Sequence, residues 1–146
     1  MDKKRYVQVG LGGRSRMYLR GVLEGYPESS EMVAVCDINQ GRVDLAVEEA
    51  KDLGADVKGY PAHRFDKMIE ECQPDTVIVT TKDCFHDKYI CRAMELGCDV
   101  ITEKPMTTDA KKCQRIIDTQ QETDQTCRVT FNYRYSPPRT QIKALL

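Results

Sequence analysis

Short apolar runs alternate with helical patterns along the whole sequence, about six times, with short connections between them. The apolar runs are rich in β-branched residues, and TVIVTT at 76–81 is the strongest of them. Strands that alternate with helices pair in parallel, because each helix carries the chain back to the start of the next strand. The sequence therefore predicts an α/β fold, a doubly wound parallel sheet with helices on both faces.

The boundaries of these elements follow from turn and cap residues. Gly54 and Gly97 each follow a helical pattern, where a C-terminal glycine commonly ends a helix. We expect strands at 5–10, 32–37, 57–60, 76–81, 98–103 and 126–135, and helices at 14–25, 40–53, 64–72, 85–96, 107–123 and from 136 onward.

The composition excludes several classes of protein. The 146 residues carry a formal net charge of −1, so we expect no nucleic-acid partner and no binding to an acidic membrane surface. No stretch approaches the roughly 20 apolar residues of a membrane span, and no apolar signal segment follows the basic N-terminus. The seven cysteines form no CxxC pair, which predicts neither a disulfide framework nor a metal site. We expect a cytoplasmic protein.

A glycine turn follows the first predicted strand, with the sequence Gly10-Leu11-Gly12-Gly13-Arg14-Ser15. Gly10 permits a tight turn, and Gly12 allows the backbone to approach a ligand closely. The helix that begins here offers free N–H groups to a dinucleotide pyrophosphate. Ser15 stands where the GxGxxG fingerprint has its third glycine, and it is small enough to keep the helix near the strand. The alternative is an ordinary glycine-rich connection between a strand and a helix.

An acidic residue ends the second predicted strand. Asp37 lies about 20 residues beyond the glycine turn, where a carboxylate accepts hydrogen bonds from the adenosine ribose of a dinucleotide. A carboxylate repels a 2′-phosphate, so the sequence favours NAD over NADP. Arg14 and Arg42 keep NADP as the alternative, because either guanidinium could pair with a phosphate. Asp37 could also be only a turn former at a strand end.

Three later segments complete a recognisable order. TTKDCFHD places Thr80, Thr81 and His86 between a strand and a helix, AMELGCDVITEKPMTTD contains Glu103-Lys104-Pro105 after a strand, and FNYRYSP follows. With the glycine turn and Asp37, this order resembles the glucose-fructose oxidoreductase and inositol dehydrogenase family, also called Gfo/Idh/MocA. The resemblance covers essentially the whole chain, and the EKP segment followed by NYRY is its most specific part.

The resemblance implies an N-terminal Rossmann domain that binds NAD or NADP and transfers hydride to or from a sugar or cyclitol. Lys104 would be catalytic, orienting the substrate hydroxyl and assisting proton transfer. Glu103 would face the cofactor ribose or position Lys104. The remaining cofactor-binding residues that it implies are Thr80, Thr81, His86 and Asn132, in addition to Gly10, Gly12, Gly13, Arg14, Ser15, Asp37 and Lys104. A solvated loop lysine at 104 and a helix-start histidine at 86 without a ligand are the alternatives.

Two departures from the family pattern bear on these expectations. Lys82-Asp83 stands where family members often have proline. The family also has a second α/β domain after the NYRY region, which supplies further catalytic residues and oligomer contacts. We therefore expect residues 1–130 to form the Rossmann domain and 131–146 to begin the link to a C-terminal domain that is absent from this chain. A homo-oligomer is expected only for the full-length protein.

Two other functions remain open from the sequence. Related proteins with a GGRG-type turn are glycosidases that retain NAD and recycle it, and the GGRS turn at 12–15 resembles theirs. The chain could also be a dinucleotide-binding module without catalytic activity of its own.

Overall fold

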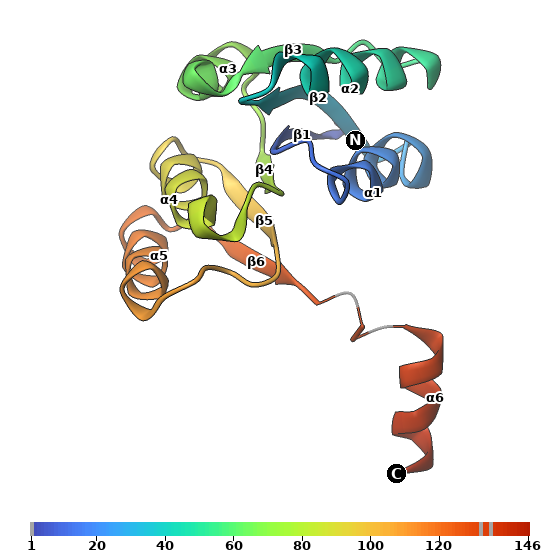
Figure 1. Cartoon of the computed structure of the whole chain (residues 1–146), viewed down its shortest axis with the longest axis vertical. Coiled ribbons are helices and arrows are strands. Elements are labelled where there is room, and N and C mark those ends of the chain that lie inside the picture. The colour runs from blue at the N-terminus through green and yellow to red at the C-terminus, as the bar shows by residue number, and fades with distance from the viewer. Residues whose placement is uncertain (1, 132, 135) are drawn as a thin grey trace.

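The computed structural model describes residues 2–131, 133–134 and 136–146. Its centre is a six-stranded sheet in the order β3-β2-β1-β4-β5-β6, and every neighbouring pair of strands is parallel (Figure 1). The strands are β1 (Lys4–Val9), β2 (Ser30–Asp37), β3 (Lys58–Pro61), β4 (Thr76–Val79), β5 (Asp99–Glu103) and β6 (Cys127–Thr130). The predicted doubly wound parallel sheet is confirmed.

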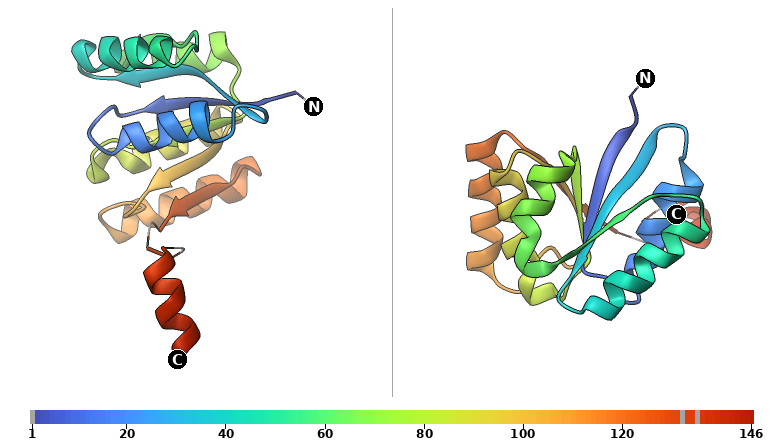
Figure 2. Two further views of the ribbon diagram at one scale, coloured as in Figure 1. Left: turned by 90° about the vertical axis from the view of Figure 1, so that its right-hand side faces the viewer. Right: turned by 90° about the horizontal axis from the view of Figure 1, so that it is seen from above.

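Helices cover both faces of the sheet (Figure 2). They are α1 (Ser15–Arg20), α2 (Gln40–Asp52), α3 (Phe65–Cys72), α4 (His86–Glu95), α5 (Ala110–Thr123) and α6 (Pro137–Leu145). Helices α1 and α2 lie on one face, and α3, α4 and α5 lie on the other (Figure 2). This division is what a doubly wound sheet requires, because right-handed crossovers on opposite sides of β1 place their helices on opposite faces.

Each face of the sheet has its own apolar core. Leu19, Val35 and Ile78 belong to the core under α1 and α2. Val77 and Ile90 belong to the larger core under α3, α4 and α5. The central strands are buried on both faces, which explains why they read as continuous apolar runs rather than as alternating patterns.

Local signals in the sequence account for the helix ends. The side chain of Asn39 caps α2 by accepting the Arg42 N–H, at 3.2 Å. Asp109 caps α5 in the same way at Lys112, at 3.0 Å. Gly97 ends α4 with a positive φ of 84°, a conformation that costs glycine little.

Three predicted elements differ from the structure, and one of them is the strand predicted at 76–81, which ends at Val79. The first helix becomes a π-helical turn at Gly21–Gly25. The last strand stops at Thr130 instead of reaching 135, because Phe131 and Arg134 close a turn through a 2.9 Å backbone hydrogen bond. Helix α6 then extends away from the sheet, with all of its residues exposed (Figure 1). Within the described residues, no helix is both long enough and apolar enough to cross a membrane.

Candidate functional site

The chain changes direction between β1 and β4. From β1 it continues toward β2, and from β4 toward β5, so the loops that follow these two adjacent strands diverge. Ligands of open α/β sheets bind in the crevice at such a point. Here two cavities of about 390 and 470 Å³ lie at this edge. Thr80 and Thr81, which follow β4, line both cavities, so the two cavities adjoin; together they are called the cleft below.

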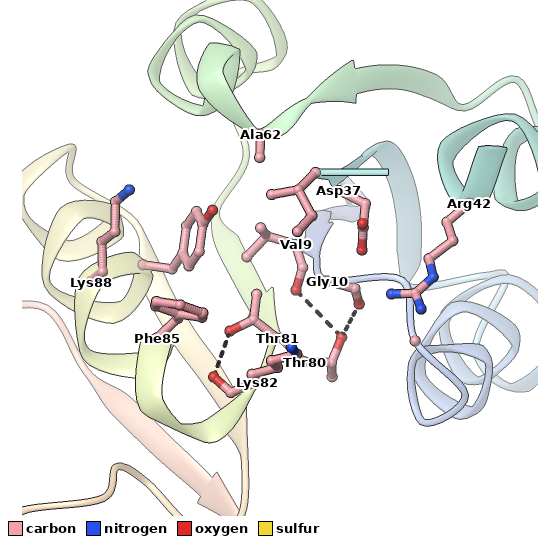
Figure 3. Close-up of a pocket in the computed structure, with 13 residues that line it drawn as sticks. Val9, Gly10, Asp37, Arg42, Ala62, Thr80, Thr81, Lys82, Phe85 and Lys88 are labelled. Atoms are coloured by element: carbon pink, nitrogen blue, oxygen red, sulfur yellow. Dashed lines mark hydrogen bonds between the residues drawn. The ribbon is translucent and has the colours of Figure 1, made fainter. Parts of the chain in front are cut away.

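The first cavity lies over the ends of β1 and β2 (Figure 3). Asp37 and Arg42 border it on the β2 side, and Phe85, Lys88 and Tyr89 border it on the α4 side. Its other lining residues are Val9, Gly10, Gly12, Ile38, Ala62, Thr80, Thr81 and Lys82. Of the two arginines considered for a phosphate, only Arg42 lines this cavity; Arg14 lines the other.

The carboxylate of Asp37 is held by the backbone. Its Oδ2 accepts the Leu11 N–H at 2.6 Å, and its Oδ1 accepts the Asn39 N–H at 2.8 Å. Asp37 is only 5% exposed, yet it borders the cavity. The end of β2 is thereby joined to the glycine turn, and the negative charge faces the cleft in one fixed orientation.

The three glycines of the turn differ in their surroundings. Gly10 has φ +91°, and a Cβ added to it would lie 2.5 Å from the backbone nitrogen of Thr81. A Cβ added to Gly12 or Gly13 would meet nothing within 4 Å. Within the described part of the chain, the N–H groups of Gly12 and Gly13 make no hydrogen bond. Gly10 is therefore required by the fold, whereas Gly12 leaves open space and unused donors beside the cleft.

Polar side chains buried beneath the turn hold it in place. The fully buried Gln8 donates through Nε2 to the carbonyl of Ser15, at 3.1 Å, and to Thr80 Oγ1, at 2.9 Å. The Thr80 hydroxyl donates to the Gly10 carbonyl at 2.6 Å. Ser15, which replaces the third glycine, is 4% exposed and donates its hydroxyl to the Gly12 carbonyl at 2.6 Å. The serine hydroxyl therefore stabilises the turn through a hydrogen bond within it.

The second cavity lies at the ends of β4 and β5. The exposed Lys104 lies here, beside the buried Glu103. The remaining lining residues are Arg14, Thr80, Thr81, Asp83, Phe131 and Tyr133. Within the described residues, the Lys104 ammonium has no hydrogen-bond partner, so it is available to a ligand.

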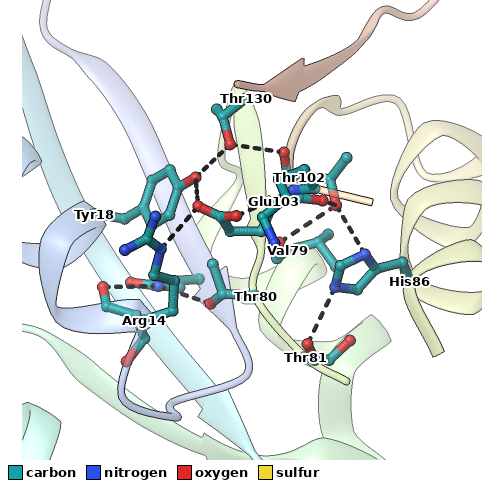
Figure 4. A network of polar contacts seen from close by, with 12 residues as sticks. Arg14, Tyr18, Val79, Thr80, Thr81, His86, Thr102, Glu103 and Thr130 are labelled. Atoms are coloured by element: carbon teal, nitrogen blue, oxygen red, sulfur yellow. Dashed lines mark hydrogen bonds and ion pairs between the residues drawn. The ribbon is translucent and has the colours of Figure 1, made fainter. Parts of the chain in front are cut away.

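Glu103 is held from the helix α1 side. Its Oε1 accepts from Arg14 Nε at 3.2 Å and from the Tyr18 hydroxyl at 3.0 Å (Figure 4). Its Oε2 accepts the backbone N–H of Lys104 at 3.1 Å. The carboxylate thus connects the first turn of α1 with the backbone of the lysine.

His86 lies behind the wall of the cleft and is 0% exposed. Its Nδ1 is 2.9 Å from the carbonyl oxygen of Pro105, and its Nε2 is 3.1 Å from that of Thr81 (Figure 4). The expectation was a cleft-lining side chain, but the ring borders neither cavity. It joins the loop after β4 to the loop after β5 and so fixes the backbone on the far side of Lys104.

The cleft brings together most of the residues singled out in the sequence. Those that line one or both cavities are Gly10, Gly12, Arg14, Asp37, Thr80, Thr81, Glu103 and Lys104. Gly13 and Ser15 instead border a groove between α1 and α2. Asn132 lies outside the described residues.

Sequence reasoning missed Gln8, Tyr18 and Thr130. Tyr18 is four residues after Arg14, so the two share one face of the helix, and this spacing was a usable signal. Gln8 and Thr130 carried no comparable signal, because a polar residue in a strand looks exposed until the packing is known. The described residues contain no group of three or more His, Cys, Asp or Glu side chains able to hold a metal ion.

Known proteins match this chain in sequence and in structure. A family profile described as an oxidoreductase family with an NAD-binding Rossmann fold matches residues 4–131. The inositol 2-dehydrogenase/D-chiro-inositol 3-dehydrogenase of Halalkalibacterium halodurans is 31% identical over 140 residues, which are 95% of this chain and 38% of that protein. Glycosyl hydrolase family 109 protein 1 of Akkermansia muciniphila is 29% identical over 140 residues, 92% of this chain and 28% of that protein.

A solved structure has a similar fold. The WlbA dehydrogenase of Chromobacterium violaceum, in complex with NADH and UDP-GlcNAcA, superposes with a TM-score of 0.85 at 27% identity. The superposition covers 97% of this chain and 39% of that one. The chain therefore spans about a third of the length of the relatives it matches.

Proposed function

The chain belongs to the Gfo/Idh/MocA oxidoreductase family and is an NAD-binding Rossmann domain, and from this premise we propose that its cleft holds NAD for hydride transfer to or from a sugar or cyclitol. The adenosine half would occupy the first cavity and the nicotinamide half the second. The observation that carries the proposal is the pair of adjoining cavities, of which the first is lined by Asp37 and the glycine turn and the second by Lys104.

The residues present fit a dinucleotide. Gly12 offers open space and an unused N–H beside the cleft, which suits close approach by a pyrophosphate. The Asp37 carboxylate is already oriented toward the first cavity, and it would accept hydrogen bonds from ribose hydroxyls. Its charge disfavours a 2′-phosphate, which supports NAD; Arg42 on the same cavity is the residue that would accommodate NADP.

Lys104 is the proposed catalytic residue. When bound, the nicotinamide supplies the hydride chemistry, and the protein supplies orientation and charge. Lys104 projects from a backbone fixed by Glu103 on one side and by His86 on the other. Its Nζ would bind the substrate hydroxyl and, as the neutral amine, would accept the proton that leaves the oxygen as the carbon is oxidised. Glu103 contributes by setting the position of Lys104.

A glycosidase activity is the second candidate. It is favoured by the 29% identity to a glycosyl hydrolase family 109 protein and by the GGRS turn. The outcome that distinguishes it is free sugar released from a glycoside without net NADH, in a full-length protein. Net formation of NADH from a polyol would support the dehydrogenase instead.

We further propose that residues 1–130 form the cofactor-binding unit and that 131–146 lead to a partner domain. This division is supported by the end of β6 at Thr130 and by the departure of α6 from the sheet. On this proposal the 146-residue chain binds the cofactor without catalysing turnover alone. The full-length protein would bind a sugar or polyol and form a homo-oligomer. We propose a cytoplasmic location, which the seven free cysteines support.

The decisive test is a calorimetric titration of this chain with NAD and with NADP. We expect saturable binding of NAD that is stronger than that of NADP. Asp37→Ala should weaken NAD binding by roughly tenfold or more, because a charge-assisted contact to the ribose is lost. The matched control is Asp44→Ala on the exposed side of α2, which should bind NAD as the wild type does. Equal weakening in both variants, or no binding by the wild type, would refute the proposal.

A further inference from the structure

We propose that Tyr18 is a positioning residue for Lys104. Its hydroxyl fixes the Glu103 carboxylate, which in turn holds the lysine backbone (Figure 4). The inference rests on the proposed function of the cleft. It connects helix α1, which follows the glycine turn, to Lys104 at the proposed nicotinamide end of the cleft.

The contacts form a continuous path. The Tyr18 hydroxyl lies 3.0 Å from Glu103 Oε1, and Glu103 Oε2 lies 3.1 Å from the Lys104 nitrogen. Arg14, one turn before Tyr18, reaches the same Oε1 at 3.2 Å. The Arg14 side chain is 52% exposed whereas that of Glu103 is 8% exposed. The ion pair alone therefore holds the carboxylate weakly, and the tyrosine supplies the less solvated contact.

The carboxylate of Glu103 determines the direction in which Tyr18 donates, and Thr130 lies on the other side of the Tyr18 hydroxyl. Thr130 Oγ1 is 2.6 Å from the Tyr18 hydroxyl and 3.1 Å from the Thr102 carbonyl oxygen. A carboxylate and a carbonyl only accept, so Tyr18 donates its single proton to Glu103, and the single proton of Thr130 is shared between the Tyr18 oxygen and the Thr102 carbonyl oxygen. The arrangement gives Tyr18 one acceptor and one donor, both on the β5–β6 edge.

The protonation state of Tyr18 agrees with this role. The pKa of Tyr18 is raised to about 12, mainly because of burial; the hydrogen bond with Thr130 opposes this rise and the nearby Glu103 contributes to it. The phenol therefore keeps its proton at neutral pH and remains a donor to the carboxylate.

The first experiment needs no ligand. Hydrogen exchange of the Lys104 amide is measured by NMR on the ¹⁵N-labelled chain, for the wild type, Tyr18→Phe and the control Tyr26→Phe. Tyr26 is 70% exposed and lies beyond the same helix. Because Phe keeps the ring but not the hydroxyl, we expect exchange at Lys104 to rise by about fivefold in Tyr18→Phe only. Unchanged exchange, or an equal rise in the control, would overturn the inference.

A second variant guards against failure of Tyr18→Phe to fold. Thr130→Val removes the donor to Tyr18 but leaves the contact between Tyr18 and Glu103. It should raise exchange at Lys104 by roughly twofold, which is less than the increase expected for Tyr18→Phe. If Tyr18→Phe does not fold, unchanged exchange in Thr130→Val overturns the inference.

The second experiment compares NAD with ADP-ribose, which lacks the nicotinamide. Tyr18→Phe should weaken binding of NAD by roughly threefold to tenfold and leave ADP-ribose unchanged, since only the nicotinamide end meets Glu103 and Lys104. A purely structural effect would weaken both ligands equally and would overturn the inference. If the wild type binds neither ligand, the proposed function fails, and the exchange measurement alone decides the role of Tyr18.

Discussion

Asp37 and Glu103 are two buried carboxylates at the carboxyl ends of β2 and β5, and the protein holds them in different ways. Asp37 accepts two backbone N–H groups, from Leu11 and Asn39. Glu103 accepts one backbone N–H, from Lys104, and two side-chain donors, from Arg14 and Tyr18.

This difference indicates how sensitive each end of the cleft is to the substitution of nearby side chains. Backbone donors are present whatever the local side chains are, and the sheet and the turn already fix them. Side-chain donors must lose rotamer freedom to make each contact, and they disappear with a single substitution. The orientation of the Asp37 carboxylate is therefore determined by the backbone fold, whereas that of the Glu103 carboxylate depends on a few side chains.

The largest expected effect concerns the backbone of the glycine turn. Gly10→Ala forces a Cβ to within 2.5 Å of the Thr81 nitrogen at a positive φ, so it should lower the free energy of unfolding by about 3 kcal/mol. Thermal unfolding followed by circular dichroism measures this change. The matched control is Gly12→Ala, which should change stability by less than about 0.5 kcal/mol while abolishing NAD binding. Equal destabilisation by the two variants would contradict the distinction between Gly10, which the fold requires, and Gly12, which the ligand requires.

The next effect concerns the acceptor at Asp37. Asp37→Ala leaves the N–H groups of Leu11 and Asn39 without their partner, and should cost about 2 kcal/mol of stability in urea unfolding. Because both donors belong to the backbone, the loss should be nearly independent of salt. Asp44→Ala provides the exposed comparison, and a loss at Asp37 no greater than at Asp44 would argue against a backbone-built site.

A smaller, salt-dependent effect is expected at Arg14. Arg14→Ala removes an ion pair whose cation is half exposed, so it should cost about 0.5–1 kcal/mol at low salt. At 1 M salt the cost should largely disappear, since screening weakens exposed pairs. Urea unfolding at the two salt concentrations checks this. A salt-independent loss would mean that Glu103 is held like Asp37, and the comparison would then fail.

The smallest effect lies outside the cleft, at a third carboxylate. Glu49 accepts from Arg16 at 2.9 Å and from Arg20 at 2.7 Å, and the hydrogen bond from Arg16 is the main cause that lowers its pKa. A lowered pKa adds stability above the ordinary glutamate value of about 4.3, and this stability is lost as the pH falls through the lowered pKa.

The comparison is made with Glu49→Gln. It should be less stable than the wild type by about 0.5 kcal/mol at pH 7, and the two should converge in acid as the pH falls below the lowered pKa of Glu49. Glu48→Gln, at an exposed position beside it, should match the wild type at every pH. A difference that persists in acid would show that the side chain acts by packing and not by charge.

The fold was largely predictable because its signals are local. Apolar runs of strand length, glycines after helices and the caps at Asn39 and Asp109 all act within a few residues. The largest difference is in the last strand, whose pattern continues to 135 although the strand ends at Thr130. Strand pairing depends on a neighbouring strand, and no residue of the sequence shows where that neighbour stops.

The candidate site was predictable only in part. Asp37 ends a strand, and Gly10 and Lys104 directly follow strands, so the topology of a parallel sheet brings all three to one edge. His86 was expected in the cleft but joins two loops behind it. The orientation of the His86 ring depends on how α4 packs against β5, and the sequence does not specify this packing.

The sequence by itself determined the order of the strands and helices, the glycine turn and the positions of Asp37 and Lys104 at strand ends, because these depend on periodicity and on residues close together in the chain. Only the tertiary structure decided how Tyr18 and Thr130, far apart in the sequence, meet at Glu103. Such contacts form when separate helices and strands are packed together, and hydrogen-bond geometry tolerates only a few tenths of an ångström. The sequence thus located the site, and the packing determined the contacts that hold its side chains.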